Sequence, residues 1–369
     1  MAVTELRVEG YRSIRELTLP LKRVNVIVGP NGCGKSNLYQ SVALLRAAAE
    51  GRLSRTLAAE GGMQSVLWAG SRKEGPVRMR IGVTLDDFEY DLELGLPQLA
   101  MSMFTLDPHV KQESILERKG MKKTPHLDRG KSACAMRNSA GEKEQYLLAL
   151  HHSEAAISQI VDPFRYPVQD DVRRRLLKWR FYHGFRTDVE SPLRRPQVGV
   201  RTHVLSPDGS DLAAALQTIV ENGDDRSLRS SFEDAFPGSS LGIESSPGGM
   251  AVSMTAAGIQ RPLAAHELSD GTLRYLCLLA ALLSPNPAPL LALNEPETSL
   301  HENLLPPLAR LIAKASESSQ IWLTTHSQIL ADALCEVSGV KPIALEKTGG
   351  ETMRAGRPSG AAFSAEWDL

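Results

Sequence analysis

The strongest constraint on the fold is a glycine-rich octapeptide that directly follows a short apolar run. The run is VNVIV at residues 24–28, and the octapeptide is GPNGCGKS at residues 29–36. Apolar residues then recur at helical spacing, at Leu38, Val42, Leu45 and Ala49. A buried strand, a GxxxxGK[ST] turn and a helix in this order are typical of a phosphate-binding loop. The sequence therefore predicts an α/β fold with this loop at an edge of the sheet.

The chemistry of the loop predicts a bound nucleotide. Its glycines let backbone N–H groups surround phosphate oxygens, and the following helix adds the positive end of its dipole. We expect Lys35 to reach the β- and γ-phosphates and Ser36 to ligate Mg²⁺. The residues assigned to the nucleotide are Asn31, Gly32, Cys33, Gly34, Lys35, Ser36 and Asn37. This loop alone leaves kinases, GTPases and ATPases open.

A second motif narrows the class. Leu268 to Thr272, written LSDGT, begins a strongly apolar helical stretch at residues 273–283. At a helix N-terminus, Ser269 and the N–H of Gly271 form a second anion site. Because the chain already has one phosphate loop, this second site is best used on a nucleotide held by another subunit. An ordinary N-cap is the alternative interpretation, and the position of the motif before the strand at 289–293 favours the anion site.

The end of that strand carries polar residues. Asn294 stands where a nucleotide-hydrolysing protein usually has an aspartate that helps to hold magnesium, and Glu295 follows it. Asparagine keeps one acceptor oxygen but lacks the charge, and loss of such an outer-shell partner costs about 10- to 100-fold in metal affinity or activity. We expect Glu295 to activate the attacking water. The pair predicts a slow ATPase that uses ATP and Mg²⁺, with Asn294 near the metal.

Another apolar run, at residues 321–325, ends at His326. In a parallel sheet His326 lies on the same edge as Glu295, where it can contact the γ-phosphate or the attacking water. Residues 299–301 are predicted to be either a loop that crosses a dimer interface or an N-capped helix start. No glutamine loop is unambiguous, and the candidates are Gln64, His183 and Arg186, each against an interpretation as surface or interlobe packing.

The arrangement of apolar runs predicts a single ATPase head over residues 1–369. Strands alternating with helices indicate a mostly parallel core sheet formed from residues 1–50 and 260–350. Period-two segments on either side of Asp86 and Asp87 predict a hairpin within an antiparallel region at about 60–120. Residues 100–135 are poor in pattern and rich in base, and predict an insertion that is partly mobile. A basic insertion and helical lobe at about 120–260, and a tail at 353–369, complete the division.

Composition excludes several classes of protein. Lys and Arg number 42 against 43 Asp and Glu, so no overall positive charge points to nucleic acid. The charged N-terminus is not a signal peptide, and the longest apolar run is shorter than the roughly 20 residues that span a bilayer. The four cysteines are widely spaced and include no CxxC pair, which argues against a disulfide framework and a zinc site. We expect a cytoplasmic protein that does not bind membranes.

The motifs together resemble a known family. TELRVEGYRSIRELTLPLKRVNVIVGPNGCGKSNL, LSDGTLR, LNEPETSLH and TTHS are similar to the RecF/SMC-like branch of the ABC-type ATPases. More narrowly, they resemble stand-alone predicted AAA-family ATPases related to the heads of the overcoming-lysogenisation-defect (OLD) nucleases. WRFYHGFRTD and SPDGSDLAAALQTI extend the resemblance over most of the chain. It implies a head-to-tail homodimer around two ATP molecules, acting in DNA repair, DNA maintenance or phage defence.

The chain departs from this family in two respects. It has no sustained heptad repeat, so we do not expect an SMC-like arm. Too few residues follow His326 for a nuclease domain, and any effector nuclease is expected to be separately encoded.

Two functions from different classes remain. The first is an ATPase whose dimer closes on DNA, with basic stretches 118–131 and 173–201 as the contact; the alternative is that these are solvated faces paired to carboxylates such as Asp170 and Asp171. The second is a nucleotide-gated module that controls an effector protein without binding DNA. A small-molecule kinase ranks third, because it would not need the motif at 268–272.

Overall fold

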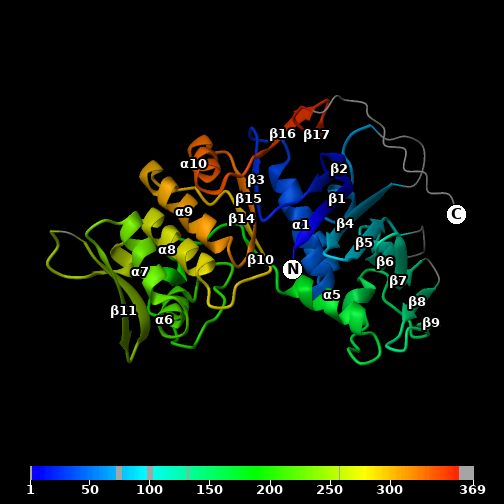
Figure 1. The fold of residues 1–369 in the computed structure, drawn as a ribbon, viewed down its shortest axis with the longest axis horizontal. Coiled ribbons are helices and arrows are strands. Elements are labelled where there is room, and N and C mark those ends of the chain that lie inside the picture. Colours follow the sequence, from blue (N-terminus) through cyan, green and yellow to red (C-terminus); the bar gives the residue numbers. More distant parts are fainter. Residues whose placement is uncertain (1, 72–76, 98–102, 131–132, 257, 357–369) are drawn as a thin grey trace.

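The computed structural model describes residues 2–71, 77–97, 103–130, 133–256 and 258–356. Two lobes flank a central sheet (Figure 1). One lobe contains α1 (Lys35–Glu50) and an antiparallel sheet, and the other contains α6 (Leu212–Asn222) to α10 (Gln328–Ser338). The central sheet is the part that brings the predicted motifs together.

The central sheet has six strands in the order β10-β14-β15-β3-β16-β17. They are β10 (Arg180–Tyr182), β14 (Leu290–Asn294), β15 (Gln320–Thr325), β3 (Val24–Val28), β16 (Ile343–Thr348) and β17 (Glu351–Arg354). The first five pair in parallel, and β17 pairs antiparallel with β16. Asn294 lies beside Thr324, and Thr325 lies beside Val28, so the carboxyl ends of these strands meet at one edge. The predicted parallel sheet is confirmed.

Both faces of this sheet are buried, which explains why its strands are continuously apolar. Ile27 and Trp322 pack in a cluster with α1 and the antiparallel sheet. Val26 and Leu323, one residue along each strand, pack in a second cluster with helices α8 (Asp270–Leu282) and α9 (Leu305–Ala315). Polar side chains are therefore left to the strand ends, where the motifs lie.

The antiparallel sheet has eight strands in the order β2-β1-β4-β5-β6-β7-β8-β9. They are β1 (Val3–Tyr11), β2 (Ile14–Pro20), β4 (Arg78–Leu85), β5 (Phe88–Gly95), β6 (His109–Lys119), β7 (Lys122–Arg129), β8 (Cys134–Arg137) and β9 (Lys143–Gln145). The predicted hairpin around Asp86 is confirmed, because Leu85 pairs with Phe88. The sheet continues to Gln145, beyond the predicted limit near 120. The antiparallel sheet also includes β1 and β2. The N-terminal part of the parallel core sheet therefore begins at β3, and not at residue 1 as predicted.

The prediction of a pattern-poor insertion at 100–135 is wrong for its described residues, because β6 and β7 form an antiparallel hairpin there, with a register shift between Ile115 and Leu116. The apolar alternation is interrupted by Glu113, whose side chain is fully buried on the inner face of β6. Its carboxylate accepts hydrogen bonds from the Tyr90 hydroxyl and from the backbone N–H groups of Ala156 and Ile157. Glu113 thus occupies a core position as a buried acid with hydrogen-bond partners, and the apolar pattern of the sequence does not reveal this position.

Short elements complete the fold. On the side of α1 lie α2 (Leu53–Ala59), α3 (Met63–Val66), α4 (Ala156–Gln159) and α5 (Pro167–Leu177); on the other side lie α6, α7 (Asp225–Ala235) and a sheet of β11 (Ser240–Ser246), β12 (Gly249–Thr255) and β13 (Leu263–Ala264). Three 3-10 turns are η1 (Pro192–Arg194), η2 (Ala265–Glu267) and η3 (Glu302–Leu304). Within the described ranges, no helix combines the length and apolar character needed to cross a membrane.

Candidate functional site

The phosphate loop connects the carboxyl end of β3 with the start of α1. Gly29, Gly32 and Gly34 have φ values of 156°, 78° and 109°, which glycine adopts without a steric penalty. The Lys35 ammonium lies inside the loop, where its Nζ donates to the carbonyl oxygens of Gly29 at 2.7 Å and Pro30 at 3.2 Å. The Lys35 residue is only 4% exposed. The loop backbone therefore curves around the buried Lys35 ammonium, a geometry suited to binding phosphate oxygens.

The last hairpin of the fold supports this loop. The Thr352 hydroxyl in β17 donates to the Cys33 carbonyl at 2.8 Å and lies 2.7 Å from the Ser13 hydroxyl. Asn37 Nδ2 in turn donates to Ser13 Oγ at 2.7 Å. A Cβ atom at Gly34 would lie 2.2 Å from Thr352 Oγ1, so only glycine fits there. Sequence reasoning missed Thr352, because no motif marks this part of the chain.

Asn294 is buried at the end of β14 and uses both atoms of its amide. Its Oδ1 accepts from the Thr324 hydroxyl at 2.7 Å, and its Nδ2 lies 3.0 Å from His183 Nδ1. His183 reaches this position because it directly follows β10, which pairs in parallel with β14. The His183 ring also lies beside that of Tyr39 in α1, with ring centroids 6.0 Å apart.

This arrangement separates the three glutamine-loop candidates. His183 contacts Asn294 at the end of β14, which is the edge where a nucleotide-contacting group is expected. Arg186 instead pairs with the exposed Asp188 at 2.7 Å, and Gln64 lies in the short helix α3. Of the three candidates, His183 is therefore the one that contacts Asn294.

Glu295 and His326 are brought together at the same edge. Glu295 has a φ of 47°, in the left-handed region that is uncommon for residues other than glycine. Its backbone N–H donates to the Thr324 carbonyl at 2.8 Å, and its carbonyl accepts from Arg274 Nη2 at 3.3 Å. Its carboxylate oxygen Oε1 lies 3.7 Å from His326 Nδ1. Burial lowers the pKa of the Arg274 guanidinium, which nevertheless stays charged at neutral pH.

Glu297 is a second acid at this edge that sequence reasoning missed. Its Oε1 accepts from the Thr325 hydroxyl at 2.6 Å and from the backbone N–H groups of His326 at 2.9 Å and Ser327 at 3.3 Å. The same oxygen lies 3.3 Å from His326 Nδ1, and the side chain is 4% exposed. Glu297 therefore holds the backbone at the end of β15 and orients His326. The available signal was a second acid, two residues after Glu295 and separated from it by Pro296.

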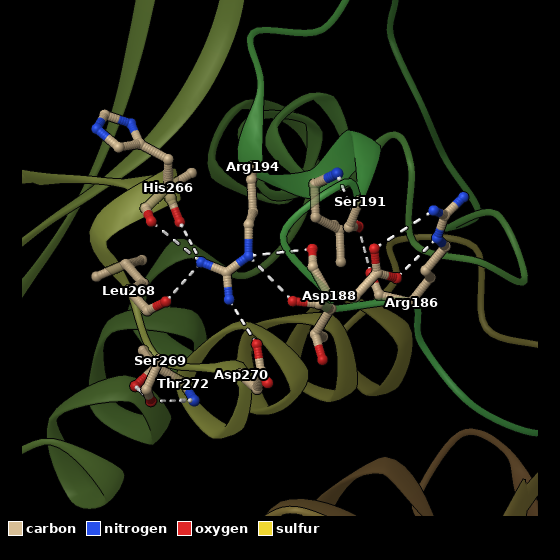
Figure 2. Close-up of polar contacts among 12 residues, drawn as sticks. Arg186, Asp188, Ser191, Arg194, His266, Leu268, Ser269, Asp270 and Thr272 are labelled. Carbon is tan, nitrogen blue, oxygen red and sulfur yellow. Dashed lines mark hydrogen bonds and ion pairs between the residues drawn. The ribbon is translucent and has the colours of Figure 1, made fainter.

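The LSDGT motif begins α8, as predicted. Ser269 is the N-cap of this helix, which is the geometry of the alternative interpretation. The Ser269 hydroxyl accepts from the Thr272 N–H at 3.1 Å and remains exposed (Figure 2). A Cβ atom at Gly271 would lie 2.7 Å from the Ser299 carbonyl, so the motif packs closely against residues 299–301. Among the described residues, no hydrogen bond or ion pair joins Ser269 or Gly271 to the phosphate loop of the same chain. His301 accepts from the Asn303 N–H at 3.2 Å, the geometry of an N-capped helix start.

Many basic residues in the stretches proposed for DNA are paired with carboxylates. Their ion pairs are Arg118 with Glu89, Arg174 with Asp170, Arg175 with Asp171, Arg195 with Glu190, and Arg201 with Glu221. Arg129 is buried and faces Glu113 at 3.7 Å, and Lys131 lies outside the described residues. This pattern matches the interpretation as faces paired with carboxylates.

A family model described as "AAA domain, putative AbiEii toxin, Type IV TA system" matches residues 24–332. The chain belongs to this AAA-domain family. The match includes the phosphate loop, the LSDGT motif, Glu295 and His326. The protein is therefore a member of a P-loop ATPase family, with ATP binding as the property its members share.

A curated protein matches part of this AAA-domain chain. The chain is 31% identical over 104 residues to the chromosome partition protein Smc of Koribacter versatilis (strain Ellin345), a match that covers 27% of this chain and 8% of that protein. The chain thus corresponds to a small part of that relative.

Two solved structures share the fold. One is an Smc head bound to the C-winged helix domain of ScpA, with a TM-score of 0.54, 16% identity, and coverage of 96% of this chain and 97% of that one. The other is an Smc head with an extended coiled coil bound to the C-terminal domain of ScpA derived from Pyrococcus furiosus, with a TM-score of 0.53, 14% identity, and coverage of 96% and 95%. The fold is that of an ABC-type ATPase head.

The oxygen donors at the site suit magnesium. Ser36 is exposed in the first turn of α1 and presents a hydroxyl, the hard oxygen donor that Mg²⁺ prefers. The oxygen of Asn294 accepts from the Thr324 hydroxyl, and we expect its contact with a metal to pass through water, as for an outer-shell group. One direct protein ligand, with the remaining positions taken by phosphate and water, is the usual pattern for Mg²⁺.

The role of Glu297 predicts a specific mutational result. Glu297→Ala removes the acceptor that fixes the N–H groups of His326 and Ser327, so we expect turnover of ATP to fall about 10- to 100-fold, the range for loss of an orienting partner. Glu297→Gln keeps an oxygen at Oε1 and should lose less. ATP affinity should change little, because Glu297 does not contact the phosphate loop. Glu302→Ala, an exposed acid in η3, is the matched control, and equal turnover of Glu297→Ala and wild type would contradict the assignment.

Proposed function

We propose that this AAA-domain protein is a slow ABC-type ATPase that closes as a head-to-tail homodimer around two nucleotides. The observation that carries the proposal is the pairing of Glu295 with His326, 3.7 Å apart. Glu295 follows β14 and His326 follows β15, and β15 lies between β14 and the phosphate-loop strand β3. An acid and a histidine at this edge, beside a loop that can hold a triphosphate, suit in-line attack of water on the γ-phosphate.

Each residue at the edge has a distinct task in this proposal. Lys35 and the N–H groups of residues 31–37 hold the phosphates, with Ser36 on the metal. Bound Mg²⁺ would neutralise charge that develops on the phosphate oxygens. Glu295, whose side chain is 30% exposed, accepts the proton of the attacking water, and His326, 47% exposed, contacts the γ-phosphate.

The dimer follows from the position of the LSDGT motif. Ser269 lies at an exposed helix N-terminus on the lobe of α6 to α10 and does not contact its own phosphate loop. A second copy, rotated head to tail, would bring its own nucleotide to this anion site. Hydrolysis would then open the dimer, because the γ-phosphate is the group shared by both subunits.

Two uses of the closed dimer remain. The family resemblance supports action on DNA in repair, maintenance or phage defence. The second candidate is a nucleotide-gated module that controls a separately encoded effector protein. It is favoured by the ion pairs of the basic stretches, and it agrees with the solved Smc heads, which hold a domain of ScpA.

The first prediction of this proposal concerns Glu295. Glu295→Gln should lower turnover by about 10²- to 10⁴-fold, the typical contribution of a general base. With ATP and Mg²⁺ it should sediment as a dimer, and without nucleotide as a monomer. Phosphate release and sedimentation velocity measure the two effects. Wild-type turnover no higher than that of Glu295→Gln would refute the ATPase, and a variant that stays monomeric with ATP would refute the dimer.

The second prediction concerns the neutral amide at 294. Asn294→Asp adds a carboxylate near the metal, so half-saturation should occur at about 10- to 100-fold lower Mg²⁺ concentration, and turnover should rise. Titration of ATPase activity with Mg²⁺ measures both quantities, with Asn294→Ala as the control that removes the acceptor oxygen. A lower turnover for Asn294→Asp than for wild type at saturating Mg²⁺ would show that the contact with His183 requires the amide.

The third prediction distinguishes the two uses of the dimer. If the dimer closes on DNA, duplex DNA should stimulate hydrolysis, and the stimulation should fall steeply as salt rises. If the protein gates an effector, hydrolysis should be the same with and without DNA. Sedimentation of Glu295→Gln with ATP, Mg²⁺ and labelled duplex decides between them, because only a DNA-binding dimer carries the label with it.

A further inference from the structure

We propose that Arg194 is a positioning residue of the anion site at the start of α8, and that it prepares Ser269 and Gly271 to receive the γ-phosphate held by a second copy of the chain. Arg194 fixes the backbone before Ser269 and offsets the charge of Asp270. The inference rests on the proposed dimer. It adds Arg194, which lies outside the LSDGT motif, to the anion site that this motif forms.

The first support is the number of contacts that converge on one side chain (Figure 2). Nη1 of Arg194 donates to the carbonyl oxygens of Leu268 at 2.7 Å and His266 at 3.2 Å, with that of Ala265 at 3.5 Å. Its Nε donates to the carbonyl oxygens of Thr187 at 3.0 Å and Asp188 at 3.2 Å. The guanidinium thus joins the turn η2, which leads into the motif, to the segment that follows β10.

The second support is burial. The Arg194 side chain is 11% exposed, whereas that of Arg195, the next residue, is 64% exposed and pairs only with the exposed Glu190. A guanidinium offers five donors in a rigid plane and remains charged near neutral pH, so it can satisfy several carbonyls at once. A lysine ammonium at this position would keep the charge but could not span the same set of acceptors.

The third support is electrostatic. Asp270 follows Ser269 in the first turn of α8, and its side chain is 58% exposed. An acid in the first turn stabilises a helix, but here it would repel an incoming triphosphate. Arg194 Nη2 lies 2.5 Å from Asp270 Oδ1, so the carboxylate is paired at the point where the phosphate would approach. Arg194 therefore removes a repulsion as well as orienting the loop.

The test measures ATP-dependent dimerisation in the Glu295→Gln background. Adding Arg194→Ala should raise the dimer dissociation constant at least about 30-fold, the lower end for truncation of a buried charged hydrogen-bonding group. Binding of a fluorescent ATP analogue to the monomer should stay the same, because the phosphate loop is untouched. Arg195→Ala is the matched control and should dimerise like the parent. A merely structural arginine would lower the thermal midpoint without this separation of dimerisation from monomer binding.

Two further variants separate orientation from charge and do not depend on Arg194→Ala folding. Asp270→Asn removes the acid and keeps Arg194, so its dimer should be as strong as the parent's or stronger, most clearly at low salt. Arg194→Lys keeps the charge but not the fork, and should give an intermediate dissociation constant. Arg194→Ala combined with Asp270→Asn should recover part of the loss.

Each outcome has a defined meaning. A Glu295→Gln parent that dimerises with ATP, together with Arg194→Ala and Arg194→Lys variants that dimerise equally well, overturns the role of Arg194 and leaves the dimer intact. A weaker dimer for Asp270→Asn overturns the electrostatic part. A parent that stays monomeric with ATP overturns the dimer and this inference together.

Discussion

The parallel pairing of β14 with β15, and of β15 with β3, is the constraint on which the rest of the site depends. In this register Asn294 lies beside Thr324 and Thr325 beside Val28, so three strand ends and the phosphate loop meet at one edge. Because both faces of the sheet are buried, the strands themselves hold few polar groups, and the chemistry is confined to the residues that follow them. A shift of one residue between β14 and β15 would separate Glu295 from His326, and such a shift in either pairing would turn core side chains to the wrong face.

This edge is maintained by buried hydrogen bonds that satisfy an irregular backbone. Glu295 adopts a positive φ, which costs of order 1–3 kcal/mol for a residue other than glycine. Its N–H is bonded to Thr324 and its carbonyl to Arg274, and Glu297 satisfies the N–H groups beyond β15. On the other side, Thr352 holds the Cys33 carbonyl. The residues assigned to the nucleotide are thus held in place by hydrogen bonds with Thr324, Arg274, Glu297 and Thr352.

The sequence predicted the residues whose chemistry and spacing are distinctive, and missed those whose role depends on tertiary contacts. The phosphate loop, the motif at 268–272 and the strand ends at 294 and 325 could be placed because each combines a local pattern with a polar break. Thr352 is more than three hundred residues from Cys33, and no local pattern records their contact. Glu113 obscured the pattern of β6, because a buried, hydrogen-bonded acid interrupts the alternation that is typical of a strand. His183 could not be chosen over Arg186 until the pairing of β10 with β14 was known.

The charges at the phosphate-loop edge of the sheet and at the start of α8 explain why a neutral residue is tolerated at position 294. Glu295, Glu297 and Asp270 already bring three carboxylates to surfaces that must accept a triphosphate. The first two lie beside His326, and Asp270 pairs with Arg194. A further carboxylate at 294 would strengthen metal binding but add repulsion wherever the metal is absent. The amide avoids that repulsion and can donate to His183 Nδ1, which a carboxylate cannot do. The segment from His183 to Arg194 contacts both the end of β14, through Asn294, and the start of α8, through Leu268 and Asp270.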